Sequence, residues 1–175
     1  MIERRTTSSA VRLSRDPSVR EAYATRTAGT LRGLAAVFHN PADPGTEFEL
    51  GPGIVERIDP GAFNEFLRSS RDVVCLWNHD ANHLLGRRLA RTLKLSVDAV
   101  GLRYVIDTPD TTLGNDMMTL AARGDIGGSS FSFIADRVRW VEEGRIAIRI
   151  IEAATLVDVS PVTFPAYAGT TASAG

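Results

Sequence analysis

Apolar and polar residues alternate in several stretches of the chain, and this period of two predicts β-hairpins. Apolar residues occupy every second position over 93–97 and again over 102–106, on either side of a short break. Residues 131–140 and 145–151 also have the character of strands, and they flank a Glu-Glu-Gly turn at 142–144. We therefore expect two hairpins, the first of which has one face in contact with water.

Two shorter runs are apolar almost throughout and predict buried strands. They cover residues 31–38 and 73–77. The second run is followed at once by Asn-His-Asp at 78–80, so we expect a histidine at the end of a central strand. A last strand is expected over 156–160, where two nearby prolines close it.

Helical periodicity is confined to two places. Asp59 stands in the N-cap position before Pro60, and apolar residues recur at helical spacing over 62–67. A second helix is predicted over 113–121, with Gly124 at the position of a C-terminal cap. Each helix is expected to bury one face.

Many short strands with few helices indicate a mostly β, α+β fold. We expect an antiparallel β-barrel surrounded by a few helices. The polar, arginine-rich stretch 1–30 is expected to form a flexible arm, and 31–168 the single folded domain. The small polar residues 169–175 are expected to be a flexible, frayed tail.

Composition and charge narrow the classes of protein that the sequence can represent. The 175 residues are 43% apolar, and 20 basic against 21 acidic residues give a net charge of -1, so nucleic acid is not the expected partner. No apolar run approaches the roughly 18 residues needed to span a membrane. The single cysteine, Cys75, excludes an internal disulfide and is expected to be a buried, unreactive thiol in a cytosolic type of protein.

The chain has only three histidines, and His79 is the one placed at the end of a predicted strand. Rigid elements that end in polar clusters commonly hold catalytic groups, although a histidine that hydrogen-bonds a loop is an equal alternative. His79 and His83 are four residues apart, as two metal ligands on one helix face are. The turn-rich sequence around them and the lack of an obvious third ligand argue against a metal site.

Two other segments carry polar residues in unusual places. Residues 124–133 combine glycines, serines and alternating aromatic residues, and they contain neither the Gly-x-Ser-x-Gly elbow nor a phosphate loop. Taken alone, this segment reads as a Gly/Ser turn. Asp158 interrupts an apolar strand, so its carboxylate needs a partner, either a histidine or one of the many arginines.

Six segments, read in order, resemble the HK97-type prohead (capsid maturation) serine proteases of tailed phages. No single motif is decisive, but their order over about residues 31 to 168 makes coincidence improbable. The segments are 31–38, 56–63, 77–80, 85–87, 123–133 and 157–167.

The resemblance implies a serine endopeptidase that cleaves segments of scaffold and major capsid proteins, and itself, inside the assembling prohead in the host bacterial cytoplasm. It implies a fold similar to that of the herpesvirus assembly protease, and self-association by analogy with that enzyme. No cofactor, metal, nucleic acid or membrane is implied. The alternative is a non-catalytic capsid assembly or scaffolding module on the same barrel.

The resemblance also assigns residues. It places the general base at His79 and the nucleophile at Ser130, with Ser129 as an adjacent ambiguity. It places the third member at Asp158, with Glu152 in reserve. Position 132, often Gly in such proteins, is Ser here.

These assignments are chemically coherent. A serine hydroxyl needs a neutral imidazole within about 3 Å to remove its proton, and an acid that orients that imidazole. Backbone N–H groups must also stabilise the oxyanion, and we expect them in the loop over 165–169.

Overall fold

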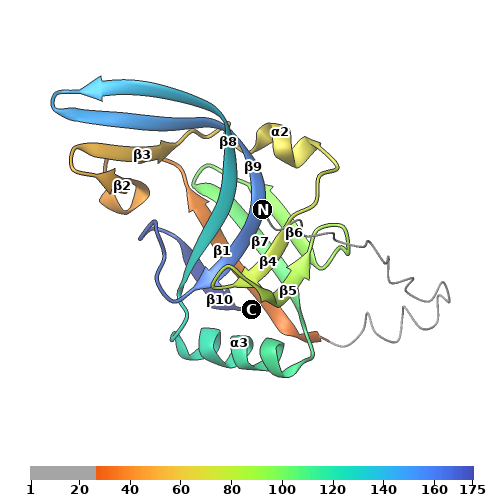
Figure 1. Cartoon of the computed structure of the whole chain (residues 1–175). Coiled ribbons are helices and arrows are strands. Elements are labelled where there is room, and N and C mark those ends of the chain that lie inside the picture. The colour runs from red at the N-terminus through yellow and green to blue at the C-terminus, as the bar shows by residue number, and fades with distance from the viewer. Residues whose placement is uncertain (1–26) are drawn as a thin grey trace, which may run out of the picture.

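The computed structural model describes residues 27–175, so most of the arm predicted at 1–30 lies outside the described residues. These residues form two sheets with helix α3 at one end (Figure 1). The strands are β1 (Thr27–Val37), β2 (Phe48–Gly51), β3 (Ile54–Ile58), β4 (Val74–Trp77), β5 (Asp80–Arg87), β6 (Leu93–Val97), β7 (Gly101–Pro109), β8 (Gly128–Glu143), β9 (Ile146–Val162) and β10 (Thr171–Ala174). The helices are η1 (Pro44–Thr46), α2 (Asn64–Arg68) and α3 (Thr112–Arg123).

The first sheet has the order β10-β1-β7-β6 and is antiparallel. Its β6–β7 hairpin confirms the one predicted from alternation over 93–106. The side chains of Leu93, Leu102 and Ile106 on this hairpin are almost completely buried, as the apolar face of an amphipathic sheet must be.

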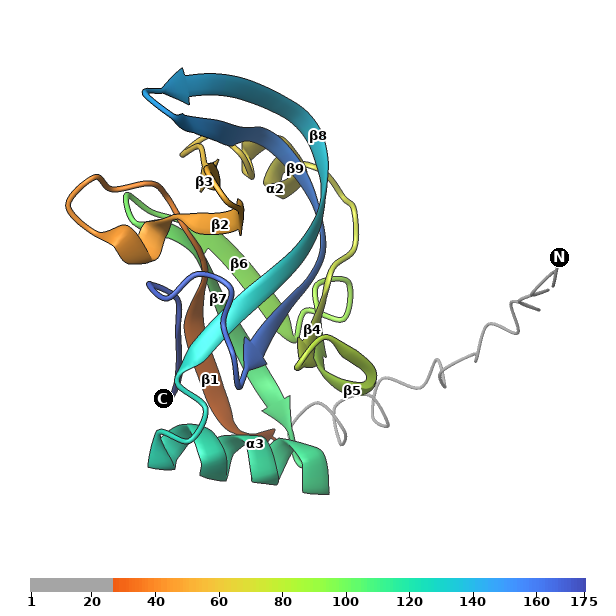
Figure 2. The ribbon, with the colours of Figure 1, turned by 60° about the vertical axis from the view of Figure 1, so that its left-hand side comes forward.

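The second sheet is organised around β9, which pairs with β8 along one edge in a long hairpin. Gly144 forms the turn of this hairpin with a positive φ of 64°, at the place predicted from sequence. Figure 2 shows the hairpin arching beyond the body of the molecule. On the other edge, β3 and then β4 pair with β9 in parallel. The sheet is therefore mixed, whereas an antiparallel arrangement was expected from the sequence.

Both predicted helices are present, but α2 is shorter than the sequence suggested. The Asp59 carboxylate accepts a hydrogen bond from the Gly61 N–H at 2.7 Å and caps a turn, and the helix itself begins only at Asn64. Helix α3 matches its prediction, because Thr111 caps its first turn and Gly124 ends it in the left-handed conformation with a φ of 81°.

The hydrophobic core lies between the two sheets, and apolar side chains of β8 point into it. Phe131 is buried and Phe133 packs against the core. Successive side chains on a strand alternate between its faces, so Ser130 and Ser132 face the opposite side. This alternation positions the candidate site.

Two regions behave differently from the sequence-based expectation. The segment expected to be a frayed tail contains β10, which pairs with β1 and buries Ala172. The turn-rich stretch after His79 forms β5, paired with β4. Both strands consist largely of small or polar residues, which give only a weak β-strand pattern in the sequence. Hydrogen bonding to a neighbouring strand stabilises them instead.

The described residues confirm a mostly β fold with few helices. Their strands pair as two separate sheets, so the closed barrel stays a prediction. Among residues 27–175, no helix has the length and apolar character required to cross a lipid bilayer.

Candidate active site

His79 occupies a two-residue turn between β4 and β5. Trp77 pairs with Asp80, and the residues between them, Asn78 and His79, have positive φ angles of 53° and 57°. This is the backbone of a type I′ hairpin turn, in which Asn is favoured at the first position and Gly is usual at the second, where this chain has His. The turn therefore holds His79 in a conformation that few side chains adopt.

Asn78 fixes this turn to the end of β9. Its N–H donates to the Pro161 carbonyl at 3.1 Å, and its side-chain oxygen accepts from the Thr163 N–H at 2.9 Å. Because both contacts come from the residue next to His79, the histidine backbone has little freedom to move. The turn-rich sequence around Asn78 predicts a turn there, but no local pattern indicates these contacts with β9.

The imidazole of His79 contacts the carboxylate of Asp158 on β9. Nδ1 and Oδ1 are 2.6 Å apart, and the Asp158 side chain is 6% exposed whereas that of His79 is 34% exposed. The structure thus brings together the predicted base and the predicted acid, which are 79 residues apart in the chain. The imidazole remains partly open to solvent.

Asp158 is held as a carboxylate. Burial opposes its ionisation, but hydrogen bonds from His79, Ser160 and Ser132 outweigh burial and lower its pKa. A carboxylate can only accept hydrogen bonds, so the 2.6 Å contact requires the hydrogen on Nδ1 of His79. In the neutral ring, Nε2 then carries the lone pair that a general base needs.

The predicted nucleophile lies on the neighbouring strand. Strand register sets Ser130 opposite Ser160 and Ser132 opposite Asp158, so all four side chains belong to one face of the sheet. Ser132 Oγ lies 3.1 Å from His79 Nδ1. Within the described part of the chain, Ser130 makes no hydrogen bond to His79, and the structure brings Ser132 closer to that ring.

Ser129 faces the other way. Its side chain is fully buried, and its hydroxyl donates to the Thr171 carbonyl at 2.7 Å. It also lies 2.8 Å from the Tyr104 hydroxyl in the core. Ser129 thus points away from the face that carries Asp158, which separates it from the site of His79.

The reserve acid, Glu152, is engaged elsewhere. Its carboxylate accepts hydrogen bonds from Arg139 at 2.6 Å and from Arg137 at 3.3 Å, and the structure does not bring it to His79. His83 lies 3.3 Å from Asp80 and packs against Trp77. Among residues 27–175, no group of three or more His, Cys, Asp or Glu side chains is placed to hold a metal ion.

Cys75 lies in the same strand that leads to His79, but it is not part of the site. The side chain is completely buried in β4, and burial raises the pKa of its thiol. A thiol in this state is neither charged nor accessible, so it fills space in the core.

The loop after β9 borders the serine-bearing face. Pro165 packs so closely over Gly128 that a Cβ there would lie 2.7 Å from the proline ring. The Tyr167 hydroxyl donates to the buried Glu56 carboxylate at 2.9 Å and anchors the far end of the loop. Phe164, the residue just before Pro165, is 89% exposed.

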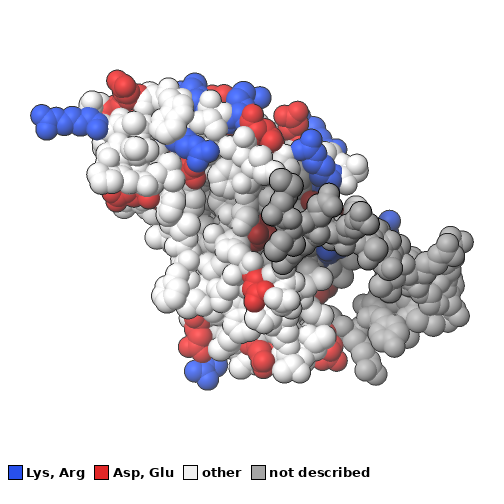
Figure 3. Space-filling model, in the orientation of Figure 1, with Lys and Arg blue, Asp and Glu red and all other residues white. Residues whose placement is uncertain are grey.

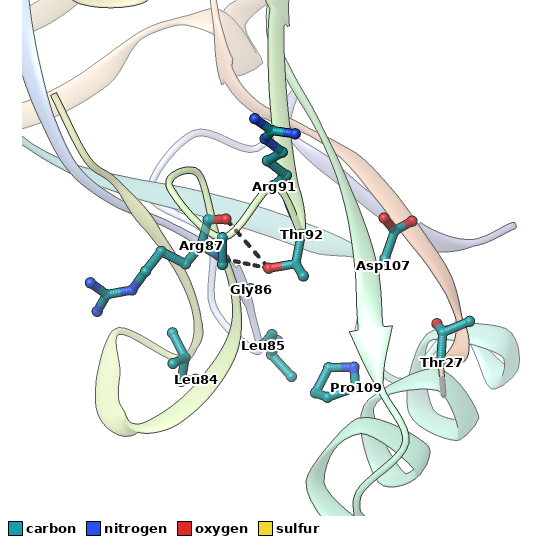
Figure 4. Close-up of a pocket in the computed structure, with 10 residues that line it drawn as sticks. Thr27, Leu84, Leu85, Gly86, Arg87, Arg91, Thr92, Asp107 and Pro109 are labelled. Carbon is teal, nitrogen blue, oxygen red and sulfur yellow. Dashed lines mark hydrogen bonds between the residues drawn. The ribbon is translucent and has the colours of Figure 1, made fainter. Parts of the chain in front are cut away.

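A pocket of about 490 Å³ lies between β5, the turn that follows it, and the end of β7 (Figure 4). Leu84 and Arg87 line one side, and Asp107 and Pro109 line the other. None of the predicted triad residues contributes to this pocket, so it is separate from the histidine–aspartate pair.

The surface carries no extended region of one charge on the face shown in Figure 3. Acidic and basic side chains are interspersed there among neutral residues. This distribution agrees with the net charge of -1.

A family comparison identifies the class of protein to which this fold and site belong. Residues 16–175 match the model of the caudovirus prohead serine protease family, and the chain belongs to that family. A search of curated proteins and a search of solved structures each found no match.

Membership defines the chemistry and the biological setting. The chain is a serine peptidase, an enzyme that hydrolyses peptide bonds, and it is a phage capsid maturation protease. Its substrates are capsid proteins, and it acts in the assembling prohead. Membership therefore favours the enzyme over the non-catalytic assembly module.

Proposed function

We propose that Ser130, His79 and Asp158 form the catalytic triad of this prohead protease. The contact of 2.6 Å between His79 Nδ1 and Asp158 Oδ1, on the face that also bears Ser130, is the observation that carries the proposal. An ionised acid paired with a histidine next to a serine is the arrangement that acyl transfer by serine requires.

Strand geometry supports Ser130 over Ser132 as the nucleophile. Ser132 contacts Nδ1, the nitrogen whose hydrogen is already directed at Asp158. Residues two apart on one strand face are separated by about 6.6 Å, so an imidazole whose Nδ1 lies beside Ser132 can direct Nε2 toward Ser130. Ser130 is then the serine available to Nε2, and a modest rotation of its side chain on substrate binding closes the contact.

The reaction follows from these positions. Nε2 of His79 removes the proton of the Ser130 hydroxyl as the oxygen attacks the peptide carbonyl. The imidazolium is stabilised by Asp158, and it returns the proton to the nitrogen of the leaving amine as the peptide bond breaks. Water, activated in the same way, hydrolyses the acyl-enzyme and restores the Ser130 hydroxyl. Donors to the oxyanion are proposed in the loop over 165–169.

The substrate is proposed to be an extended segment of scaffold or major capsid protein, or of the protease itself. Among the described residues, β8 pairs only with β9, and its other edge has no strand partner. A peptide added to such an edge gains backbone hydrogen bonds and is aligned past Ser130. Association of several copies, and the barrel shared with the herpesvirus assembly protease, belong to the same proposal.

The triad is tested with Ser130→Ala, His79→Ala and Asp158→Asn variants co-expressed with the capsid protein. We expect no processing above background for the first two, and a loss of about 10³- to 10⁴-fold for Asp158→Asn. Glu152→Gln is the matched control, because its carboxylate pairs with arginines, and it should process at the parental rate. Parental processing by Ser130→Ala, or a loss in Glu152→Gln equal to that in Asp158→Asn, contradicts the assignment.

A further inference from the structure

We propose that Ser132 and Ser160 are positioning residues whose hydroxyls hold the Asp158 carboxylate against His79. The inference rests on the proposed triad and deepens it, because it gives a role to the serine nearest to the histidine. Ser132 then acts through the acid, and Ser130 alone is the nucleophile.

The positions of both serines are fixed by the strands that carry them. Ser132 lies directly opposite Asp158 on β8, and Ser160 lies two residues beyond Asp158 on β9, on the same face. Ser160 is completely buried, and its hydroxyl donates to Asp158 Oδ1 at 2.7 Å. Neither hydroxyl depends on a flexible loop for its position.

Ser132 and His79 lie close together because both face the same acceptor, the Asp158 carboxylate. Nδ1 of His79 has one hydrogen, and a carboxylate at 2.6 Å is a stronger acceptor than the hydroxyl at 3.1 Å. Ser132 lies opposite Asp158 across the strand pair, so its hydrogen is free to point at that carboxylate, and this interaction helps to lower the pKa of Asp158. Ser132 thus bridges the ring edge and the acid.

The Asp158 carboxylate is buried, so it needs hydrogen-bond donors from the protein to remain ionised. Asp158 is only 4% exposed, so little water reaches it, and an ionised carboxylate without donors is costly in such a place. A carboxylate has about four acceptor positions: His79 and Ser160 both donate to Oδ1, and Ser132, directly opposite on β8, is placed to be a third donor. The acid stays ionised and keeps one orientation, and so does the imidazole that depends on it.

The first test measures the rate and the position of labelling by a fluorophosphonate probe. In Ser132→Ala we expect label on Ser130, identified by mass spectrometry, and a labelling rate lower by about tenfold at neutral pH. Ser132→Thr keeps the hydroxyl and should restore the rate. Ser96→Ala, an exposed serine on β6, is the matched control and should label like the parent.

The second test is the pH profile, which a purely structural role would not move. The acidic limb of the labelling rate reports proton uptake by the coupled His79–Asp158 pair. Without Ser132, the carboxylate loses a donor to its ionised form, so the pair takes up a proton more readily. The acidic limb should therefore shift to higher pH in Ser132→Ala, and further in the Ser132→Ala, Ser160→Ala double variant. Because Ser160 is buried, its variants are compared only after circular dichroism shows the parental fold.

The outcomes separate this inference from the triad itself. If Ser132→Ala labels at the parental rate with an unshifted profile while Ser130→Ala is unlabelled, the positioning role is overturned and the triad stands. If the probe is found on Ser132, or if Ser130→Ala still labels, both proposals are overturned. Reduced labelling on Ser130 with a shifted acidic limb supports both.

Discussion

Phe164 has 89% of its surface exposed although its neighbours on both sides are fixed. The Thr163 N–H is held by the Asn78 side chain at 2.9 Å, and Pro165 packs over Gly128. Gly128 precedes Ser130 by two residues on the same strand face, so Phe164 projects from the border of the candidate site. A large apolar side chain that is exposed to water at this position is suited to contact a bound peptide.

We expect Phe164→Ala to weaken binding of a capsid-protein peptide, because the substrate loses an apolar surface to cover. The predicted effect is a rise of about tenfold in KM with a small change in kcat, and parental labelling by a small fluorophosphonate. Leu89→Ala, which removes a side chain that is 65% exposed on another loop, is the control. An unchanged KM in Phe164→Ala contradicts the prediction.

At the scale of single elements, the packing of β1 between β7 and β10 depends on one close approach. A Cβ at Gly33 would lie 2.1 Å from the Thr171 carbonyl oxygen and 2.6 Å from the Tyr104 ring. Gly33 pairs with both neighbouring strands, opposite Tyr104 on β7 and Ala172 on β10. The absence of a side chain there lets β10 dock, and β10 in turn receives the Ser129 hydroxyl that precedes the candidate nucleophile.

Gly33→Ala is therefore expected to lower the free energy of unfolding by about 1 to 3 kcal/mol, since backbone and a buried ring must move to admit one methyl group. Urea unfolding followed by circular dichroism measures this. Gly51→Ala serves as the control, because a Cβ there meets no atom within 4 Å. Equal stability of the two variants contradicts the close-packing argument.

At the scale of the whole molecule, β9 connects the parts of the candidate site. Its first half pairs with β3 and its second half with β4, whose following turn carries His79, while β8 pairs along its entire other edge. Three segments distant in sequence thus meet at Asp158. The stability of this arrangement depends on the charge of a buried carboxylate, so it depends on pH.

The pKa of Asp158 is lowered on folding, so its contribution to stability is present above the unfolded value of about 3.9 and is lost as pH falls through the folded value. We expect the stability difference between the parent and Asp158→Asn to shrink as the pH falls below about 4. Urea unfolding at several pH values measures it. Asp116→Asn, on the exposed face of α3, is the control, and a difference independent of pH contradicts the prediction.

Local sequence patterns were sufficient for much of the architecture. The β6–β7 and β8–β9 hairpins, helix α3 and its glycine cap follow from periodicity and turn residues, because these depend on neighbours in the chain. Strands β5 and β10 were not predicted, since their small or polar residues are stabilised by pairing with distant partners. The parallel pairs along β9 have no local signal either.

The order of amino acids indicates which residue types can carry the chemistry: a histidine at a strand end, serines on a strand, and an aspartate within an apolar strand. The pairing of distant strands then selects among them, because it brings Asp158 and not Glu152 to His79, turns Ser129 toward the core, and places Ser132 and Ser160 around the acid. The physical reason is that strand alternation assigns each residue a face, while register and pairing, which are set between distant segments, decide what lies opposite it.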